Sequence, residues 1–324
     1  MLEVNWGQGF NRVAAARLGN PLLASVGFKA WHEWEYNHVA SCGREIPDRL
    51  PLHQVAMSEP RVVKAIEAWN FDTKEHRFEF YSVLLENQGN FYCCKSFNRP
   101  FSPSSAEVRE LFEGATLVPG SYYLGQLPPP ETATRAAPTA LSDPNVYFKK
   151  ITPYMYDPEL PVTNSPALDM MREMQLCEEL NVKLQQNPSD SDLHLCRYLG
   201  YLPTPDGNHL WGLCFERHQL TLSHAVRDKA VFDPQAVIDG VRRGLERLHS
   251  LGYAHNDINP ANIMLNSKGF PVIIDFDGCC KIGDLVVKGG TPGFELDSDV
   301  SSRENDFGAL AKVQRWLEDK YTTA

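Results

Sequence analysis

The sequence predicts a mixed α+β fold, and three patterns lead to this prediction. Apolar residues recur at helical spacing in two segments, residues 167–183 and 235–251. Two short apolar runs, Ile263–Leu265 and Pro271–Ile274, flank the turn sequence Asn266–Gly269, as in a β-hairpin. The composition, with 43% hydrophobic and 22% charged residues among 324, is that of a folded protein.

The first 115 residues contain no recognisable catalytic motif, and we expect them to form an N-terminal extension of unknown role. Residues 59–69 predict a helix, because Pro60 stands where the first helical turn tolerates proline. Residues 77–85 and 90–97 predict a β-hairpin around a turn that contains glycine.

Beyond residue 128 the sequence predicts a loop and then regular elements. The loop covers residues 128–144, where proline is frequent. The elements expected after it are a strand over 146–149, a helix over 167–183, strands over 193–202 and 209–216 joined by a turn, and a helix over 235–251 that Pro234 opens and Gly252 ends. The hairpin at 263–274 follows shortly afterwards.

Charge and composition narrow the possible partners and compartments. The net charge of −10 disfavours nucleic acids and anionic membranes, so we expect neither as a partner. No run approaches the roughly twenty apolar residues of a membrane span, and the first residues lack the basic and apolar regions of a signal peptide. The eight cysteines show no Cys-x-x-Cys spacing, which argues against a zinc site. We therefore expect a cytoplasmic or nuclear protein with reduced thiols.

Three polar residues have a spacing suited to phosphoryl transfer. Asp257 is followed five positions later by Asn262 and eighteen positions later by Asp275. The hairpin predicted between Asn262 and Asp275 returns the chain to its starting end, so one cation could bridge both side chains. A carboxylate can accept the proton of an attacking hydroxyl, and the other two groups can hold Mg²⁺ against the phosphates of ATP. The pattern favours an ATP-dependent enzyme.

The motifs around these residues resemble those of the protein-kinase superfamily, over about residues 145–310. The resemblance rests on His-Asn-Asp-Ile-Asn-Pro-Ala-Asn at 255–262, Asp-Phe-Asp at 275–277 and Gly-Thr-Pro-Gly at 290–293. The same traits are similar to those of divergent kinase-like proteins of filamentous fungi. The resemblance implies ATP and Mg²⁺ as cofactors and a hydroxyl group as the phosphoryl acceptor.

The resemblance also implies a role for each polar residue. Asp257 is the implied catalytic base, and Asn262 and Asp275 are the implied magnesium ligands. Lys149 matches the strand lysine that holds the α- and β-phosphates, and Glu173 on the next helix is its implied partner.

An adenine site is implied by the same resemblance. The predicted strand ending at Glu216 is similar to the strand that leads into the kinase hinge. Phe215 would lie behind the adenine, and the backbone of Glu216, Arg217 and His218 would bond its edge. Asn259 would lie near the γ-phosphate, where protein kinases normally keep a lysine.

The implied architecture is bilobal, with an N-terminal extension over residues 1–115. A β-rich N-lobe is expected over 116–218, and a mainly helical C-lobe over 219–324. In the C-lobe, Asp306 would brace the catalytic loop. The C-lobe is expected to be truncated, because only about one helix separates the activation segment from Ala324.

Departures from the kinase pattern leave alternatives open. Asn259 replaces the lysine, Asp277 replaces the glycine of Asp-Phe-Gly, and no Gly-x-Gly-x-x-Gly motif precedes Lys149. Residues 119–125 are the nearest candidate for a glycine-rich loop. The expected function is ATP- and Mg²⁺-dependent phosphoryl transfer by a divergent serine/threonine protein kinase. The alternatives are a small-molecule kinase of the aminoglycoside- or choline-kinase type and an inactive pseudokinase that acts as a scaffold.

Overall fold

The structure is a computed structural model. It describes residues 26–27, 59–70, 77–129, 131–153, 156, 165–189, 194–286, 288–295 and 298–322. The chain divides into two compact units: a first unit of Met1–Tyr122 and Thr152–Ser165, and a second unit of Tyr123–Ile151 and Pro166–Ala324. The structure mixes helices with β-sheets, which confirms the α+β class and is compatible with a kinase-like fold. The lobe boundaries expected at residues 115 and 218 stay predictions.

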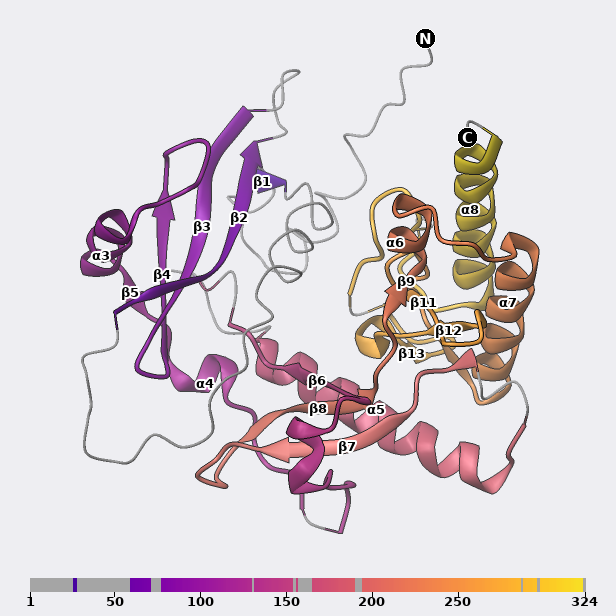
Figure 1. Ribbon diagram of the computed structural model, residues 1–324. Helices are drawn as coiled ribbons and strands as arrows, with labels where there is room; N and C mark the ends of the chain where they lie inside the picture. The colour runs from indigo at the N-terminus through magenta and orange to yellow at the C-terminus, as the bar shows by residue number, and fades with distance from the viewer. Residues whose placement is uncertain are drawn as a thin grey trace. The chain divides into compact units, whose positions relative to one another are not determined.

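The first unit contains a five-stranded antiparallel sheet in the order β1-β2-β3-β4-β5 (Figure 1). Its strands are β1 Val26–Gly27, β2 Arg61–Asn70, β3 Arg77–Asn87, β4 Asn90–Ser96 and β5 Thr116–Leu117. Helix α3 (Ser105–Glu113) begins with a capping box between Ser104 and Glu107. Its buried Val108 belongs to one apolar cluster with Val83 and Leu85 of β3.

The helix predicted over residues 59–69 is wrong, because this segment forms strand β2. Strand β2 pairs with β3 along its whole length, from Arg61 to Asn70. The β-branched residues Val62 and Ile66 fit a pleated strand better than a helix, and pairing with a long neighbour outweighs the local proline signal. The hairpin predicted next is confirmed, since β3 and β4 pair directly across a turn in which Gly89 has a positive φ of 79°.

The second unit begins with a three-stranded sheet in the order β6-β8-β7. Its strands are β6 Val146–Lys150, β7 Tyr198–Pro203 and β8 Leu210–Glu216. Helix α5 (Pro166–Gln186) contacts β7 and β8 and lies beside them in Figure 1. The strands predicted over 146–149 and 209–216 and the helix predicted over 167–183 are confirmed. The strand predicted over 193–202 begins only at Tyr198, and residue 193 lies outside the described residues. The predicted loop at 128–144 also contains a short 3₁₀ helix, η1 (Pro138–Ser142).

The remainder of the second unit combines helices with short strands. Its elements are β9 Leu220–Thr221, α6 Leu222–Arg227, α7 Pro234–Ser250, β10 Tyr253–Ala254, β11 Ile263–Leu265, β12 Pro271–Ile273, η3 Phe276–Gly278, β13 Cys280–Lys281 and α8 Arg303–Thr322. Strands β12, β11 and β9 form one sheet, and β10 pairs with β13. A short helix, α4 (Gly120–Tyr123), lies where the chain passes from the first unit to the second.

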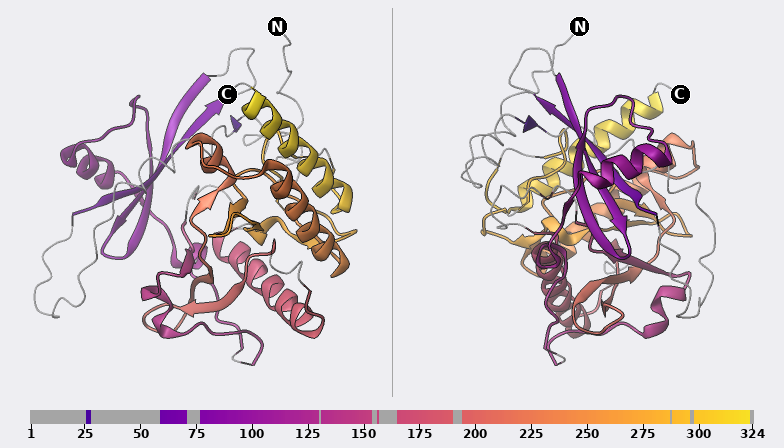
Figure 2. Two further views of the ribbon diagram at one scale, coloured as in Figure 1. Left: turned by 45° about the vertical axis from the view of Figure 1, so that its right-hand side comes forward. Right: turned by 90° about the vertical axis from the view of Figure 1, so that its left-hand side faces the viewer.

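Helix α7 organises the core of the second unit. Its side chains Val237, Val241, Leu245 and Leu248 are fully buried, as their helical spacing predicted. Helix α7 packs against α8 and against β12, and the two helices lie side by side in Figure 2, α7 in brown-orange and α8 in yellow. Gly252, with a positive φ of 92°, follows the end of α7 and turns the chain into β10.

The hairpin of β11 and β12 sets the position of the polar segment. Ile263 pairs with Ile273, and Asn266 closes the turn by accepting hydrogen bonds from two backbone N–H groups. The carbonyl of Asn262 accepts a hydrogen bond from the N–H of Ile274 at 3.0 Å. The residues just outside the hairpin are therefore neighbours. No helix in the described parts of the chain is both long and apolar enough to cross a bilayer.

Candidate active site

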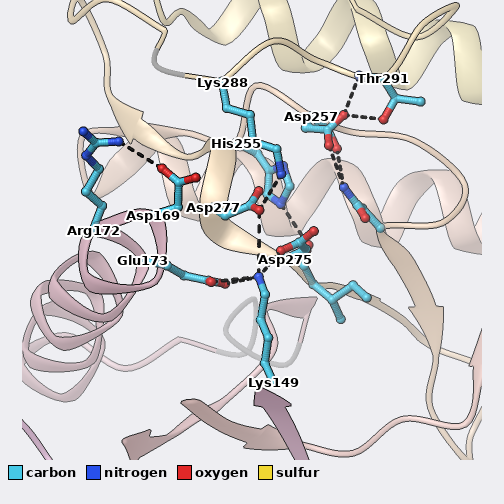
Figure 3. A network of polar contacts seen from close by, with 12 residues as sticks. Lys149, Asp169, Arg172, Glu173, His255, Asp257, Asp275, Asp277, Lys288 and Thr291 are labelled. Atoms are coloured by element: carbon cyan, nitrogen blue, oxygen red, sulfur yellow. Dashed lines mark hydrogen bonds and ion pairs between the residues drawn. The ribbon is translucent and has the colours of Figure 1, made fainter. Parts of the chain in front are cut away.

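A buried ion pair joins strand β6 to helix α5. The ammonium of Lys149 lies 2.7 Å from Oε2 and 2.9 Å from Oε1 of Glu173, the pairing that the resemblance implied (Figure 3). Glu173 is 1% exposed and stands on the apolar stripe of α5, between the buried Met170 and Cys177. A carboxylate in such a place needs a cationic partner, because burial without one is costly.

Lys149 also binds Asp275, so one ammonium links β6, α5 and the end of β12. Burial lowers the pKa of Lys149, but the charges of Asp275, Glu173 and Asp277 outweigh this effect and hold it well above its usual value. Burial works against ionised Asp275, yet Lys149 and Lys288 together lower the pKa of this carboxyl to about 2. Lys149 and Asp275 are therefore both charged at neutral pH.

Asp257 lies in the loop after β10, and both of its carboxylate oxygens accept hydrogen bonds. Its Oδ1 accepts from the backbone N–H and the hydroxyl of Thr291, both at 2.7 Å, and its Oδ2 accepts from the Asn262 amide at 3.0 Å. Burial raises the pKa of the Asp257 carboxyl, and the hydrogen bond from the Thr291 hydroxyl opposes that rise. The carboxylate of Asp257 is thus fixed in position by Thr291, which lies more than thirty residues further along the chain.

Asp306 at the start of α8 shapes the loop that carries Asp257. It is fully buried, and its carboxylate accepts the backbone N–H groups of His255 at 2.8 Å and Asn256 at 2.7 Å. His249 contacts the same carboxylate at 2.8 Å. Asn256 has a positive φ of 63°, a strained conformation that these bonds help to hold. The bracing contact implied for Asp306 is therefore present.

Asn262 and Asp275 lie at one end of the β11–β12 hairpin. The Asn262 amide nitrogen donates to the carbonyl and to Oδ2 of Asp257. This arrangement leaves its carbonyl oxygen, Oδ1, outside the hydrogen bonds of the described residues. Asp275 adopts a left-handed backbone conformation, with φ of 65°, as the chain leaves β12 and enters η3. Asn262 Oδ1 and the carboxylate of Asp275 are the two groups here that could bind a metal ion.

The side chain of Asn259 forms hydrogen bonds within its own loop and to Thr291. Its amide nitrogen donates to Thr291 Oγ1 at 2.9 Å and to the Asp257 carbonyl at 3.2 Å. Its carbonyl oxygen accepts the backbone N–H groups of Ala261 and Asn262. Asn259 therefore closes the loop upon itself, and its polar atoms are engaged there.

The strand predicted to lead into an adenine site ends with mostly engaged backbone groups. The N–H of Glu216 donates to Arg197, and the N–H of Arg217 donates to Asn145. Among the described residues, His218 is the one of the three whose N–H makes no hydrogen bond. Phe215 is buried against Tyr198, with ring centroids 5.6 Å apart. Residues 119–125, the nearest candidate for a glycine-rich loop, contain helix α4 instead of a hairpin turn.

Sequence reasoning missed one residue of this site, Lys288. Its ammonium lies 2.5 Å from Oδ2 of Asp277, and Lys149 lies 4.0 Å from the same oxygen. Asp277 Oδ1 is buried and has no hydrogen-bond partner. The available signal was the position of Lys288, two residues before the Gly-Thr-Pro-Gly motif at 290–293.

Comparison with known proteins finds short matching segments. A segment is 53% identical over 64 residues to serine/threonine-protein kinase 16 of Mus musculus, covering 20% of this chain and 21% of the mouse protein. The human protein of the same name matches with 53% identity over 36 residues, which are 11% of this chain and 12% of its own length. A probable serine/threonine-protein kinase of Schizosaccharomyces pombe is 42% identical over 55 residues, 16% of this chain and 7% of the yeast protein.

A part of this chain is similar to segments of proteins named as serine/threonine kinases. The matches span about a fifth or less of the relatives' lengths. No family model matches the chain. The relationship is thus kinase-like and partial.

Proposed function

We propose that this protein transfers the γ-phosphoryl group of ATP to a serine or threonine hydroxyl of a protein substrate. The observation that supports the proposal best is the convergence of Asp257, Asn262 and Asp275 beside the Lys149–Glu173 ion pair. A positioned base, two oxygen donors for a metal and an anchored ammonium are the groups that phosphoryl transfer requires. The partial relationship to serine/threonine kinases points to the same reaction.

The residues at the hairpin end suit Mg²⁺. Asn262 Oδ1 and the Asp275 carboxylate are hard oxygen donors, which this ion prefers. Asp277 Oδ1, buried and without a hydrogen-bond partner, is a third oxygen that a nearby cation would stabilise. When bound, Mg²⁺ would neutralise charge on the phosphate oxygens.

Four residues of the candidate site have defined parts in the proposed reaction. Asp257 accepts the proton of the acceptor hydroxyl, whose oxygen forms the new bond to the γ-phosphorus. The bond between the γ-phosphorus and the β–γ bridging oxygen breaks, and ADP leaves with its electron pair. Lys149, held in place by Glu173, binds the α- and β-phosphates. Asp306 keeps the loop of Asp257 in its conformation throughout.

The proposal also includes a site for the adenine ring and a cellular compartment for the reaction. Phe215 would lie behind the adenine ring, and the N–H of His218 and the carbonyl of Glu216 would bond its edge. We place the reaction in the cytosol or the nucleus, where the free thiols of buried residues such as Cys177 and Cys214 would stay reduced.

The test measures MgATP binding by calorimetry and γ-phosphate transfer to a panel of peptides and hydroxylated metabolites. Asp257→Asn should lower turnover by about 10²- to 10⁴-fold, because it removes the base, while leaving nucleotide affinity nearly unchanged. Asp239→Asn, which alters a partly exposed carboxylate of α7 outside the candidate site, is the matched control and should behave like wild type.

Three results would contradict the proposal in different ways. A wild-type protein that binds no nucleotide would refute both kinase functions. Binding without transfer to any acceptor would favour the pseudokinase scaffold. Transfer to metabolites but to no peptide would favour the small-molecule kinase.

A further inference from the structure

The loop that carries Asp257 contains no cation to face a γ-phosphate. No lysine or arginine occurs between His255 and Asn262. Asn259, at the position where a lysine was expected from the resemblance, uses its amide to hold Thr291 and the loop backbone. Its side chain is neutral and engaged, so a positive charge near the transferred group has to come from another segment.

The carboxyl groups around Lys149 outnumber the ammonium groups. Asp275 and Asp277 face the ammonium of Lys149 together with Glu173, and burial raises the pKa of Glu173 to about 7. Like charges at these distances repel the phosphates of ATP unless a second cation offsets them. A bound metal ion would offset part of this charge, but the excess of carboxylates over ammonium groups on the protein favours a second lysine.

Lys288 is the cation that lies in the right place. Its ammonium lies 2.5 Å from Asp277 Oδ2, and the ammonium of Lys149 lies 4.0 Å from the same oxygen (Figure 3). Its charge is near enough to Asp275 to help Lys149 lower the pKa of that carboxyl against the effect of burial. Burial raises the pKa of Asp169, and the charges of Arg172 and Lys288 oppose that rise. The Lys288 side chain is 42% exposed, so it can exchange one anionic partner for another.

The short segment that carries Lys288 also carries the threonine that binds Asp257. Lys288 stands three residues before Thr291, which donates two hydrogen bonds to Asp257. The segment 288–291 therefore extends from the metal-binding carboxylates to the proposed base. Gly290 keeps this segment close to the loop, because a Cβ there would lie 2.9 Å from Glu295 Cβ and 3.1 Å from the Asn256 carbonyl.

We propose that Lys288 binds the γ-phosphate of ATP and supplies the positive charge that Asn259 lacks. This inference rests on the proposed function. Lys288 releases Asp277 when MgATP binds, keeps its proton, and neutralises charge on a non-bridging oxygen of the γ-phosphoryl group. The proton of the acceptor still goes to Asp257. In the absence of nucleotide, Asp277 holds the ammonium in position.

The test compares ATP with ADP, since only ATP has a γ-phosphate. Lys288→Met should weaken ATP binding about tenfold, as measured by calorimetry, while ADP affinity stays within about twofold of wild type. Turnover should fall by about 10²-fold, because a charge aimed at the transition state is lost. Lys288→Arg should keep most of the preference for ATP over ADP. Lys281→Ala, which removes an exposed lysine of β13, is the matched control.

A double variant separates this role from simple pairing with Asp277. If Lys288 only neutralises Asp277, adding Lys288→Met to Asp277→Asn should change neither turnover nor the ratio of ATP to ADP affinity, and this result would overturn the inference. We expect the double variant to be slower than Asp277→Asn and to lose the preference for ATP over ADP. Circular dichroism spectra and melting curves of each variant check that it is folded.

The inference and the proposed function fail in distinguishable ways. If the wild type binds ATP and transfers phosphate, and Lys288→Met leaves the ratio of ATP to ADP affinity unchanged, the inference is wrong and the function stands. If the wild type binds neither nucleotide, both are wrong. The binding measurements need no acceptor substrate, so the result does not depend on identifying one.

Discussion

Asp257 is held by residues that also tune its acidity. Burial favours its neutral form, whereas the Thr291 hydroxyl stabilises the carboxylate and opposes that effect. Asn259 links the two residues, since its amide donates to Thr291 Oγ1 at 2.9 Å. The acidity of the proposed base therefore depends on burial first and, in the opposite direction, on a threonine more than thirty residues away in sequence.

Removing the Thr291 hydroxyl should shift the pH dependence of turnover. Thr291→Val keeps the backbone N–H but loses one hydrogen bond to the ionised carboxylate, so the pKa of Asp257 should rise further. A base with a higher pKa becomes protonated at a higher pH, and the acidic limb of the pH–rate profile should move upward. Thr291→Ser, which keeps the hydroxyl, should leave the limb in place. An unmoved limb in Thr291→Val would show that Thr291 does not tune the base.

At the scale of elements, the ends of helices and strands position the site. Helix α7 ends at Ser250 and delivers the chain through β10 into the loop of Asp257. The start of α8 provides Asp306, which holds that loop. The start of α7 is fixed by Asp233, whose side chain accepts the N–H groups of Gln235 and Ala236. The site thus depends on where these helices begin and end.

Loss of the Asp233 cap should destabilise the second unit. Asp233→Ala leaves two N–H groups of α7 without their side-chain partner and should cost about 1 kcal/mol of unfolding free energy. Asp239→Ala removes the same charge from a partly exposed position of the same helix, where the carboxylate binds only the Gln235 side chain among the described residues, and should cost about a few tenths of a kcal/mol. Urea denaturation followed by circular dichroism measures both. Equal effects of the two variants would contradict a specific capping role.

At the scale of the whole molecule, the two units have separate apolar cores. Leu85 is buried in the cluster that α3 covers, and Leu245 is buried in the cluster around α7. All the residues of the candidate site belong to the second unit. Nucleotide binding is therefore expected to depend on the second core.

Matched core truncations test this dependence. Leu85→Ala and Leu245→Ala each remove a fully buried side chain and should each cost about 2–5 kcal/mol of stability. MgATP affinity at 25 °C should be unchanged in Leu85→Ala and weakened in Leu245→Ala. Calorimetry and limited proteolysis measure the two effects. A loss of affinity in Leu85→Ala would show that the first unit takes part in nucleotide binding.

Most elements of the second unit could be predicted from local sequence. The four core positions of α7 follow helical spacing, and the hairpin of β11 and β12 has a clear turn sequence. Strand β2 could not be predicted, because a proline near its start resembled a helix signal and its pairing with β3 is a long-range effect. Local patterns identify elements whose periodicity is strong, but they do not reveal which neighbours a segment will find.

The sequence by itself determined the α+β class and the spacing that brings Asn262 and Asp275 to one end of a hairpin. It also pointed to Lys149 and Glu173 through their similarity to a known motif. Only the tertiary structure decided that the side chain of Asn259 forms hydrogen bonds within its own loop and that Lys288 lies in the site. The physical reason is that hydrogen bonds and charges act through space, so the partners of a side chain depend on segments that the fold brings together.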